Sequence, residues 1–437
     1  GGQPSPGETL SGGCTLPFSN AKGGASEVIN LFIQKYNSML PTVDILGLGT
    51  APTATRWGAA VQAVYDDRVL IAGGAEFKDG CTDWDGVECL NSVLDTAETF
   101  DAATGQFAPV GFGVAQVMAQ GRAFASAVEL PTGEIAIFGG IGTNKEALNS
   151  VEIFDPFSGT FTPGPPMQFT RAWHTATLFS DIDDGFILIA GGYGSGSDKY
   201  EIWNKTSGTV SSGLLNDGAR WRHTATLITG VENSRDKIVI AGGESDTAVK
   251  STYEIFDLSL QTPDFDPTPY DLCLSANEAQ QGFPAKGRTL HAAELVREQE
   301  FLYVVGGFYD LAHTQTTSDI CVWDIQSEDF NDAATNFKMQ IPRGGLSATT
   351  LPGNIVLLAG GLTSNTTTAG TFETIFEYIN QNHSKVIDVG PPAPLVDGRW
   401  GHSATLLGDG RVLLLGGIQV HLGQYQGVGS AEVYRSY

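Results

Sequence analysis

The amino-acid sequence predicts an all-β fold built from seven copies of one four-stranded unit. Glycine accounts for 55 of the 437 residues, which is typical of many short strands joined by tight turns. An arginine opens each copy at a spacing of roughly fifty residues, and the apolar segment that follows ends in a glycine pair. The arginines are Arg56, Arg122, Arg171, Arg220, Arg288, Arg343 and Arg399.

The third copy shows the strands of one unit most clearly. Residues 175–178 are predicted as a first strand, a DIDDG turn reverses the chain, and residues 186–190 form a second strand ending at Gly191 and Gly192. The segment KYEIWN that follows is the third strand, and a more ragged fourth strand is visible in the second copy as GTFTPGPPM. Four short strands at this period predict a β-propeller blade, so the sequence predicts a seven-bladed ring.

The two ends of the chain are predicted to meet in one blade. The seventh copy stops after its third strand, SAEVY (430–434), whereas TVDILGLG (42–49) has the pattern of a fourth strand with no copy before it. Closure by this N-terminal strand would remove an exposed sheet edge. The predicted domains are an N-terminal tether and helix over residues 1–42 and the propeller over residues 43–437.

One short N-terminal helix is predicted over residues 25–40, with the sequence ASEVINLFIQKYNSML. Ser26 is placed to cap it, and Val28, Leu31 and Phe32 lie on one face at helical spacing. Such a helix is expected to brace the β domain. Membrane contact is disfavoured because the helix carries a single lysine.

The repeated motif resembles a kelch repeat. The pattern R-x-x-H-[TS]-A-T-L, a glycine pair and [AV]-E-x-[YF]-D recurs in register, with RAWHTATL (171–178) and SVEIFD (150–155) as examples. The segment GRVLLLGG (410–417) is most similar to the corresponding segments of bacterial secreted kelch proteins. The resemblance covers residues 43–437 and implies the propeller fold.

The recurring polar side chains are interpreted as structural. Arginines at one register are expected to bridge neighbouring blades, with third-strand carboxylates as partners. Histidine stands three positions after the arginine in four copies, and equivalent positions in separate blades cannot converge on one metal. No catalytic residue is predicted, because the sequence has neither a supported Ser/His/Asp set nor a G-x-S-x-G elbow. The histidines are His174, His223, His291 and His402.

The net charge of −25 argues against nucleic acid or anionic membrane as a partner. No apolar run reaches the length of a membrane span. Residues 1–13, rich in Gly and Ser, are typical of a tether after a cleaved signal or a lipid-bearing cysteine. We therefore expect a secreted, periplasmic or cell-surface protein with a possible lipid-tethered N-terminus.

Five cysteines bear on the redox compartment. Cys81 and Cys89 bracket one loop and are expected to form a local disulfide, as in an oxidising compartment. Cys14 is expected to be the odd one, although it could pair with Cys273 or Cys321. The spacing matches no zinc or haem pattern.

The loop DGCTDWDGVEC (79–89) gathers Asp79, Asp83, Asp85 and Glu88. Such oxygen ligands raise the possibility of Ca²⁺, but the twelve-residue spacing of a calcium loop with its terminal bidentate Glu is absent. The alternative is a disulfide-tied acidic surface loop. No other cofactor is expected.

Loop length gives the one asymmetry that points to a binding surface. The loops after the glycine pairs are longer in blades 5, 6, 7 and 1, which become neighbours when the ring closes. We expect an exported, non-enzymatic binding or assembly scaffold that contacts a protein or glycan through this arc. Its predicted binding residues are Asp83, Trp84, Phe308, Tyr309, His313, His421 and Tyr425.

The resemblance also leaves an enzymatic alternative open. Kelch propellers are similar to the galactose-oxidase-type copper radical domain and to sialic-acid mutarotases, so a propeller enzyme acting on carbohydrate is the second hypothesis. The first class needs a Tyr–Cys pair with further Tyr and His ligands, and no cysteine here lies in a repeat-facing loop beside suitable partners. The second class has six blades rather than seven.

Overall fold

A computed structural model describes the chain in the following ranges: 14–19, 26–31, 38–43, 49–64, 67–78, 81, 87–111, 116–182, 184–231, 234–273, 287–296, 301–330, 337–364, 367–368, 371–379, 385–389, 392–421 and 424–435. Within these ranges the regular elements are β-strands and one 3-10 turn, η1 (Val87–Cys89). The prediction of an all-β propeller is confirmed.

The first four blades follow one another in chain order, each an antiparallel sheet. Blade 1 is β4 (Ala60–Val64), β5 (Arg68–Ala72), β8 (Ala97–Asp101) and β9 (Gln106–Pro109). Blade 2 is β11 (Ser126–Glu129), β12 (Ile135–Phe138), β14 (Val151–Asp155) and β15 (Thr160–Gly164). Blade 3 is β16 (Thr175–Ser180), β17 (Phe186–Ala190), β18 (Lys199–Asn204) and β19 (Gly208–Leu214). Blade 4 is β20 (Thr224–Ile228), β21 (Lys237–Ala241), β22 (Thr252–Asp257), β23 (Asp264–Phe265) and β24 (Tyr270–Asp271).

The remaining sheets complete the ring. Blade 5 is β25 (Ala292–Val296), β26 (Phe301–Val305), β27 (Ile320–Asp324) and β28 (Asp329–Phe330). Blade 6 is β29 (Ser347–Leu351), β30 (Ile355–Ala359), β33 (Thr371–Ile379), β34 (Lys385–Val389) and β35 (Ala393–Pro394). Blade 7 is β36 (Ser403–Leu406), β37 (Arg411–Leu415), β40 (Ala431–Arg435) and β3 (Ser38–Pro41).

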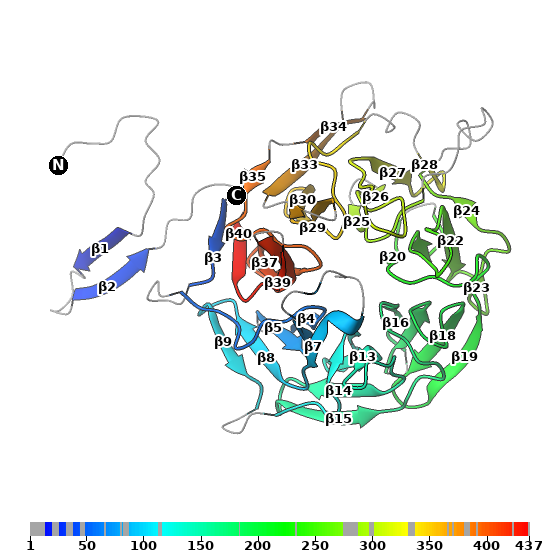
Figure 1. Ribbon diagram of the computed structural model, residues 1–437, viewed down its shortest axis with the longest axis horizontal. Helices are drawn as coiled ribbons and strands as arrows, with labels where there is room; N and C mark the ends of the chain where they lie inside the picture. Colours follow the sequence, from blue (N-terminus) through cyan, green and yellow to red (C-terminus); the bar gives the residue numbers. More distant parts are fainter. Residues whose placement is uncertain are drawn as a thin grey trace.

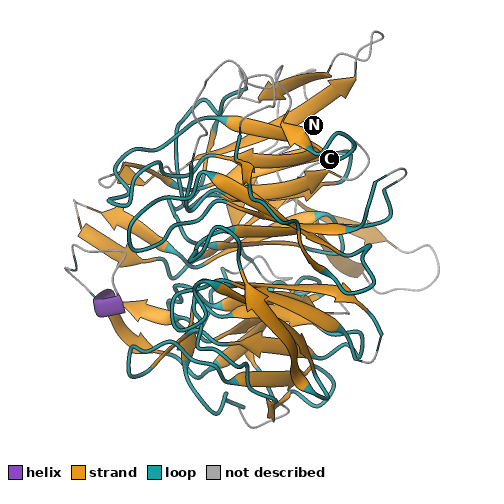
Figure 2. Ribbon diagram, turned by 90° about the vertical axis from the view of Figure 1, so that its right-hand side faces the viewer, coloured by secondary structure: helices purple, strands orange, loops and turns teal. Residues whose placement is uncertain are grey.

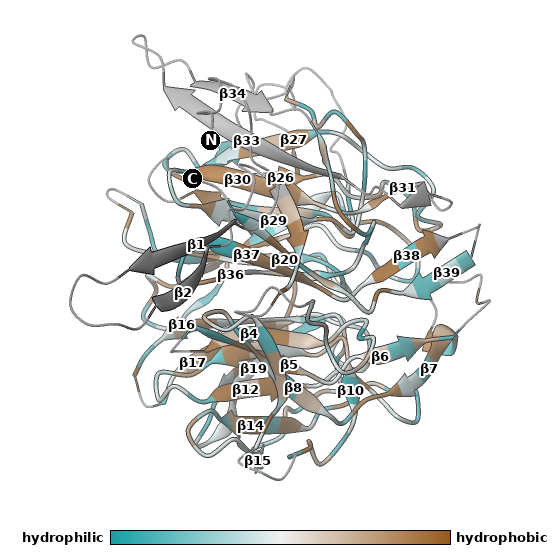
Figure 3. Ribbon diagram, turned by 90° about the vertical axis from the view of Figure 1, so that its left-hand side faces the viewer, coloured by the Kyte–Doolittle hydropathy of each residue, from teal (hydrophilic) through white to brown (hydrophobic). Residues whose placement is uncertain are grey.

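Short hairpins and ribbons lie outside these sheets. They are β1 (Cys14–Ser19) with β2 (Ser26–Leu31), β6 (Ala75–Phe77) with β7 (Leu90–Val93), β10 (Arg122–Ala123) with β13 (Ile141–Gly142), β31 (Leu362–Ser364) with β32 (Thr367–Thr368), and β38 (Ile418–His421) with β39 (Gln424–Gly427). The hairpin β1–β2 lies outside the ring (Figure 1). Figure 3 shows β6–β7 and β38–β39 projecting on one side of the molecule.

The blades stand around a common axis, with their strands stacked across the molecule (Figures 1 and 2). The first strand of each blade contacts the first strand of the next, and the contact between β36 and β4 closes the circle. The second strands are almost wholly buried, as in β12, β21 and β26. Their Val, Ile, Leu and Phe side chains fill the spaces between neighbouring sheets, because a strand covered on both faces gains stability from apolar residues at every position.

The glycine pairs join each blade to the next through the backbone. The N–H of the second glycine donates to the carbonyl of the following blade's arginine, from Gly74 to Arg122 (2.8 Å) through to Gly417 and Arg56 (3.3 Å). The first glycine has a positive φ, and a Cβ on Gly191 would lie 2.4 Å from the carbonyl oxygen of Arg220. The pair is therefore required by this close backbone approach.

The N-terminal helix prediction is wrong for the residues described. Residues 26–31 form strand β2, and residues 38–41 form β3, which pairs antiparallel with β40. An isolated helix of this length is only marginally stable, whereas the open edge of β40 offers a full ladder of backbone partners. The closing strand thus precedes the expected residues 42–49, of which 44–48 lie outside the described residues.

Two disulfides are present. Cys81 bonds to Cys89, as predicted, and Cys273 bonds to Cys321. The second disulfide settles the alternatives left open for Cys14, since both of its possible partners are already used. No helix among the described residues is long and apolar enough to span a membrane.

Candidate functional site

The blade arginines are structural clamps within their own blades. Arg122 donates to the carbonyl of Gly139 (2.8 Å) and to the carboxylate of Glu152 on the third strand (2.7 Å), and both side chains are buried. The same ion pair occurs between Arg56 and Glu98 at 2.8 Å. The predicted carboxylate partner is therefore confirmed, while the bridge between blades runs through the arginine carbonyl and the glycine pair. Equivalent pairs are Arg171–Glu201, Arg220–Glu254 and Arg399–Glu432.

Three of the four recurring histidines, His223, His291 and His402, link neighbouring blades through a ring nitrogen. The Nε2 of His223 lies 2.9 Å from the hydroxyl of Thr175 in the preceding blade, and His402 pairs in the same way with Ser347 at 2.9 Å. Burial, reinforced by the charge of Arg399, lowers the pKa of His402 to about 3. These histidines are neutral at pH 7 and serve the scaffold, as predicted.

A pocket of about 490 Å³ opens over blade 3, on the face where second strands run into third strands. Blade 3 crosses this face with a loop of only residues 193–198, between the longer loops of blades 2 and 4. The short loop forms the floor and its neighbours form the walls. The lining residues are Lys145, Glu146, Ala147, Thr170, Tyr193, Gly194, Ser197, Trp221 and Asp246.

Tyr193 is the aromatic platform of this pocket. Its backbone is fixed by two hydrogen bonds with Ala172, of 2.7 and 2.9 Å, while 41% of the residue is exposed. Its ring packs edge-on between Trp173 and Trp221, with ring centroids 6.0 and 5.9 Å away. The described residues give its hydroxyl no hydrogen-bond partner. A rigid, half-exposed aromatic ring with a free hydroxyl is thus presented to solvent.

A buried carboxylate holds the wall behind Tyr193. Glu244 accepts hydrogen bonds from the indole of Trp221 (3.1 Å) and the guanidinium of Arg222 (2.6 Å), and its other oxygen lies 2.8 Å from Nε2 of His313. Burial opposes ionisation of Glu244, but the His313 hydrogen bond and the Arg222 charge outweigh it and lower the pKa. Glu244 therefore connects the pocket to the loop of blade 5.

The backbone near the propeller axis also fixes the position of the pocket wall that contains Trp221. The residue two positions after each blade arginine has a positive φ, including Trp173 (51°) and Arg222 (56°). The N–H of Arg222 donates to the carbonyl of Trp173 at 3.1 Å, and its guanidinium carbon lies 4.9 Å from the centre of the Trp173 ring. Side chains beneath the pocket are thus held in place by both backbone and cation–π contacts.

Comparison with known proteins finds the fold among solved structures. A fungal alcohol oxidase of the AA5 family, in complex with copper, is 13% identical with a TM-score of 0.60, covering 92% of this chain and 76% of that chain. YjhT is 12% identical with a TM-score of 0.50, covering 77% of this chain and 99% of that chain. No protein-family model and no curated protein matches the sequence. The chain is a kelch-type β-propeller.

Three of the residues predicted to bind a partner lie in the interior of the kelch propeller. Phe308 is 0% exposed in an apolar cluster near the axis, His313 packs against its ring at 5.2 Å, and Tyr425 packs against Phe77 at 6.3 Å. Their aromatic character reflects core packing beneath long loops, so they cannot touch a partner directly. This corrects their assignment as contact residues.

The other predicted residues have different outcomes. Tyr309 is 38% exposed, and its hydroxyl donates to Thr317 (2.7 Å) or Asp319 (2.9 Å). Asp83 and Trp84 lie outside the described residues, and His421 ends β38 with its side chain outside them too. Tyr309 alone is therefore seen at the surface of the predicted arc.

Sequence reasoning missed Tyr193 and Glu244, although a signal for both exists. Each residue directly follows a glycine pair, and this register position pairs with the residue after the blade arginine in every blade. The position holds an apolar residue in five copies, namely Ala75, Ile141, Phe308, Leu362 and Ile418. A tyrosine and a glutamate there depart from the repeat.

Copper and Ca²⁺ are the two metals that the hypotheses from the sequence raise. Among the residues that the structure describes, no three His, Cys, Asp or Glu side chains come together as a metal would require. Cys81, Cys89, Cys273 and Cys321 are all in disulfides. Of the acidic loop considered for Ca²⁺, Glu88 is described, and it lies 3.1 Å from Lys145.

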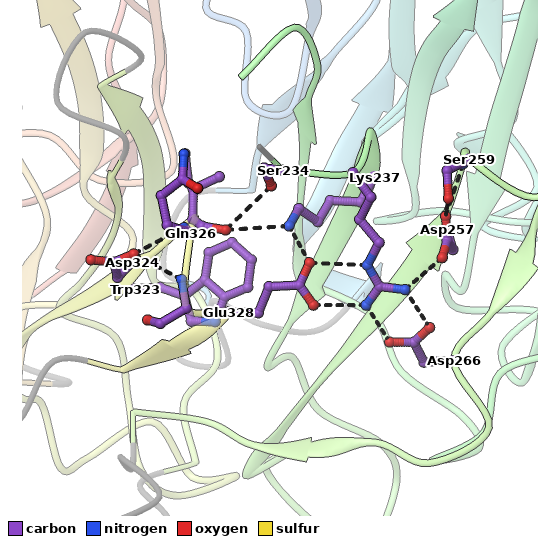
Figure 4. A network of polar contacts seen from close by, with 12 residues as sticks. Ser234, Lys237, Asp257, Ser259, Asp266, Trp323, Asp324, Gln326 and Glu328 are labelled. Atoms are coloured by element: carbon purple, nitrogen blue, oxygen red, sulfur yellow. Dashed lines mark hydrogen bonds and ion pairs between the residues drawn. The ribbon is translucent and has the colours of Figure 1, made fainter. Parts of the chain in front are cut away.

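A second cluster of charged groups lies between blades 4 and 5, and its members pair with one another (Figure 4). Arg235 donates to Asp257, Asp266 and Glu328, while the wholly buried Lys237 pairs with Glu328. These hydrogen bonds, first of all those that Arg235 donates to Asp266, raise the pKa of Arg235. The cluster joins the two blades and leaves no group free for a ligand.

Proposed function

We propose that this kelch propeller is an exported, non-enzymatic binding module that recognises a carbohydrate at the pocket over blade 3. The observation that carries the proposal is the half-exposed ring of Tyr193 at the floor of a pocket of about 490 Å³. Sugars present flat C–H faces that stack on aromatic rings, and their hydroxyls need a rim of hydrogen-bonding groups.

The rim of the pocket supplies such groups. Glu146 and Asp246 are exposed on opposite walls, and Ser197 and Thr170 add hydroxyls near the floor. The described residues place no hydrogen-bond partner on the carboxylates of Glu146 and Asp246. Two free carboxylates favour neutral or amino sugars and disfavour acidic ones, because a uronate or sialate would meet like charge.

The two disulfides support an oxidising, extracytoplasmic location for this module. The seven-bladed ring closed by β3 would hold the pocket rigid, since both ends of the chain share one sheet. Preorganisation of this kind reduces the conformational entropy lost on binding.

Glycan-array screening followed by calorimetry on the best hit tests the proposal. Tyr193→Ala is expected to abolish binding without lowering the melting temperature, because the side chain is half exposed. Tyr309→Ala is the matched control, since it removes an exposed tyrosine from the same face in blade 5. Loss of binding in the Tyr309 variant alone would move the site to the arc of blades 5, 6, 7 and 1.

An enzyme on the same scaffold is the alternative, favoured by the fold it shares with the copper-containing alcohol oxidase. Metal analysis of the purified protein separates the two functions. Stoichiometric copper, together with oxidation of a sugar alcohol, would replace the binding proposal. A metal-free protein that binds glycans through Tyr193 would support it.

A further inference from the structure

Blade 5 departs from the arginine–glutamate pairing at one residue of its third strand. The third-strand position that holds Glu152 in blade 2 and Glu254 in blade 4 holds Cys321 in blade 5. Arg288, the arginine of this blade, lies with Nη2 3.1 Å from the Cys321 sulfur. The cystine sulfur therefore stands where blades 1, 2, 3, 4 and 7 carry a glutamate carboxylate.

Arg288 is a wholly buried cation, and the described part of the chain gives it no anionic partner. Its exposure is 0%, and its Nη1 donates only to the carbonyls of Val304, Gly306 and Asp319, at 3.1 to 3.4 Å. No carboxylate lies within ion-pair distance of it among the described residues. Burial lowers the pKa of Arg288, and Tyr309 and Asp319 offset this only in part. A buried charge of this kind is stabilised by any anion that forms beside it.

We propose that the Cys273–Cys321 disulfide is a thiol-modification site, with Cys273 as the attacked sulfur and Cys321 as the leaving group. A small-molecule thiolate attacks Sγ of Cys273, the new sulfur–sulfur bond forms there, and the Cys273–Cys321 bond breaks. The electron pair goes to Sγ of Cys321, which becomes a thiolate 3.1 Å from Nη2 of Arg288. The product gives blade 5 the arginine–anion pair that is seen in blades 1, 2, 3, 4 and 7.

The direction of exchange follows from the surroundings of the two sulfurs. A thiol that is stabilised as an anion leaves faster, and Cys321 has the Arg288 guanidinium in contact. Both sulfurs pack in the same apolar cluster, but the described residues place no cation against Cys273. Attack on Cys321 would expel the Cys273 thiolate into this apolar cluster and is therefore disfavoured.

Exchange with glutathione tests the site on the whole, disulfide-intact protein. The protein is incubated with reduced glutathione, quenched with N-ethylmaleimide, digested and analysed by mass spectrometry. Glutathione is expected on Cys273 and N-ethylmaleimide on Cys321. Glutathione on Cys321, an equal mixture, or no adduct at either cysteine while Cys81–Cys89 reacts would each overturn the proposal.

Two arginine variants separate the electrostatic effect from loosening of the fold. In Arg288→Met, the exchange rate relative to the internal Cys81–Cys89 reference should fall by about 3- to 10-fold, because the leaving thiolate loses its counter-ion. Arg122→Met removes an equivalent clamp from blade 2, which carries no cystine, and should leave this ratio unchanged. Arg288→Lys should restore most of the rate. Should Arg288→Met fail to fold, the position of glutathione on the unmodified protein still decides the question.

Discussion

Replacing one blade arginine tests how much the buried arginine–glutamate ion pair of a blade contributes to stability. Arg122→Met removes a buried guanidinium that lies 2.7 Å from a carboxylate oxygen of Glu152. That carboxylate also accepts the N–H groups of Ala119 (2.8 Å) and Gln120 (3.1 Å), so it stays in place after the substitution. A buried carboxylate without its cation is the main destabilising consequence.

The expected loss follows from burial. Breaking a buried ion pair by removing one partner costs about 3–5 kcal/mol. For a chain of 437 residues the entropy of unfolding is roughly 0.9 kcal/mol/K, so the melting temperature should fall by about 3–6 °C. Arg288→Met leaves no carboxylate behind, and we expect it to lower the melting temperature by less than half as much.

Scanning calorimetry of both variants at pH 7 measures this difference. Each variant removes the guanidinium of one blade, but only Arg122→Met leaves a carboxylate without its cation. Equal falls in melting temperature at pH 7 would therefore contradict the role assigned to the carboxylate.

Three further predictions concern the scaffold and the pocket. The folded pKa of His402 is about 3 against 6.5 unfolded, so its stabilisation is full above pH 6.5 and is lost as the pH falls toward 3. His402→Leu should reduce, without removing, the fall in melting temperature between pH 6.5 and 4, because burial lowers the pKa of the other three blade histidines too. Glu244→Gln should weaken sugar binding about tenfold in calorimetry by loosening Trp221, with little change in the affinity of a Tyr309→Ala control. Deleting residues 1–41 should expose the edge of β40 and produce oligomers in light scattering.

The scaffold was predictable because it repeats. A single arginine or glycine pair carries little information, but copies at one register identify positions that every blade needs for the same geometry. The ion pair of Arg122 with Glu152 and the blade-bridging bond of His402 are both consequences of that register. The closing strand was misplaced because β3 occurs once, and its conformation is decided by a partner, β40, that lies at the other end of the sequence.

The pocket was not predictable from the length of single loops, because the depth of a hollow depends on how a loop compares in length with the loops of the two adjacent blades. Long loops in blades 1 and 5 bring aromatic side chains that fold inward, as Phe308 does, and cover the core. The shortest loop, residues 193–198, leaves a hollow between its neighbours and exposes Tyr193. Selecting the longest loops as binding sites therefore identifies loops that surround a pocket and misses the short loop at its floor.

Departures from the repeat give a better guide than loop length, and they gather in adjacent blades. Tyr193 in blade 3 and Glu244 in blade 4 replace apolar residues after the glycine pair, and Cys321 in blade 5 replaces the clamp glutamate. His313 of blade 5 binds Glu244, which supports Trp221 in the pocket wall. Other blades keep the ordinary residues at these positions. The proposed ligand at blade 3 would account for the first two exceptions, and the proposed exchangeable disulfide would account for the third.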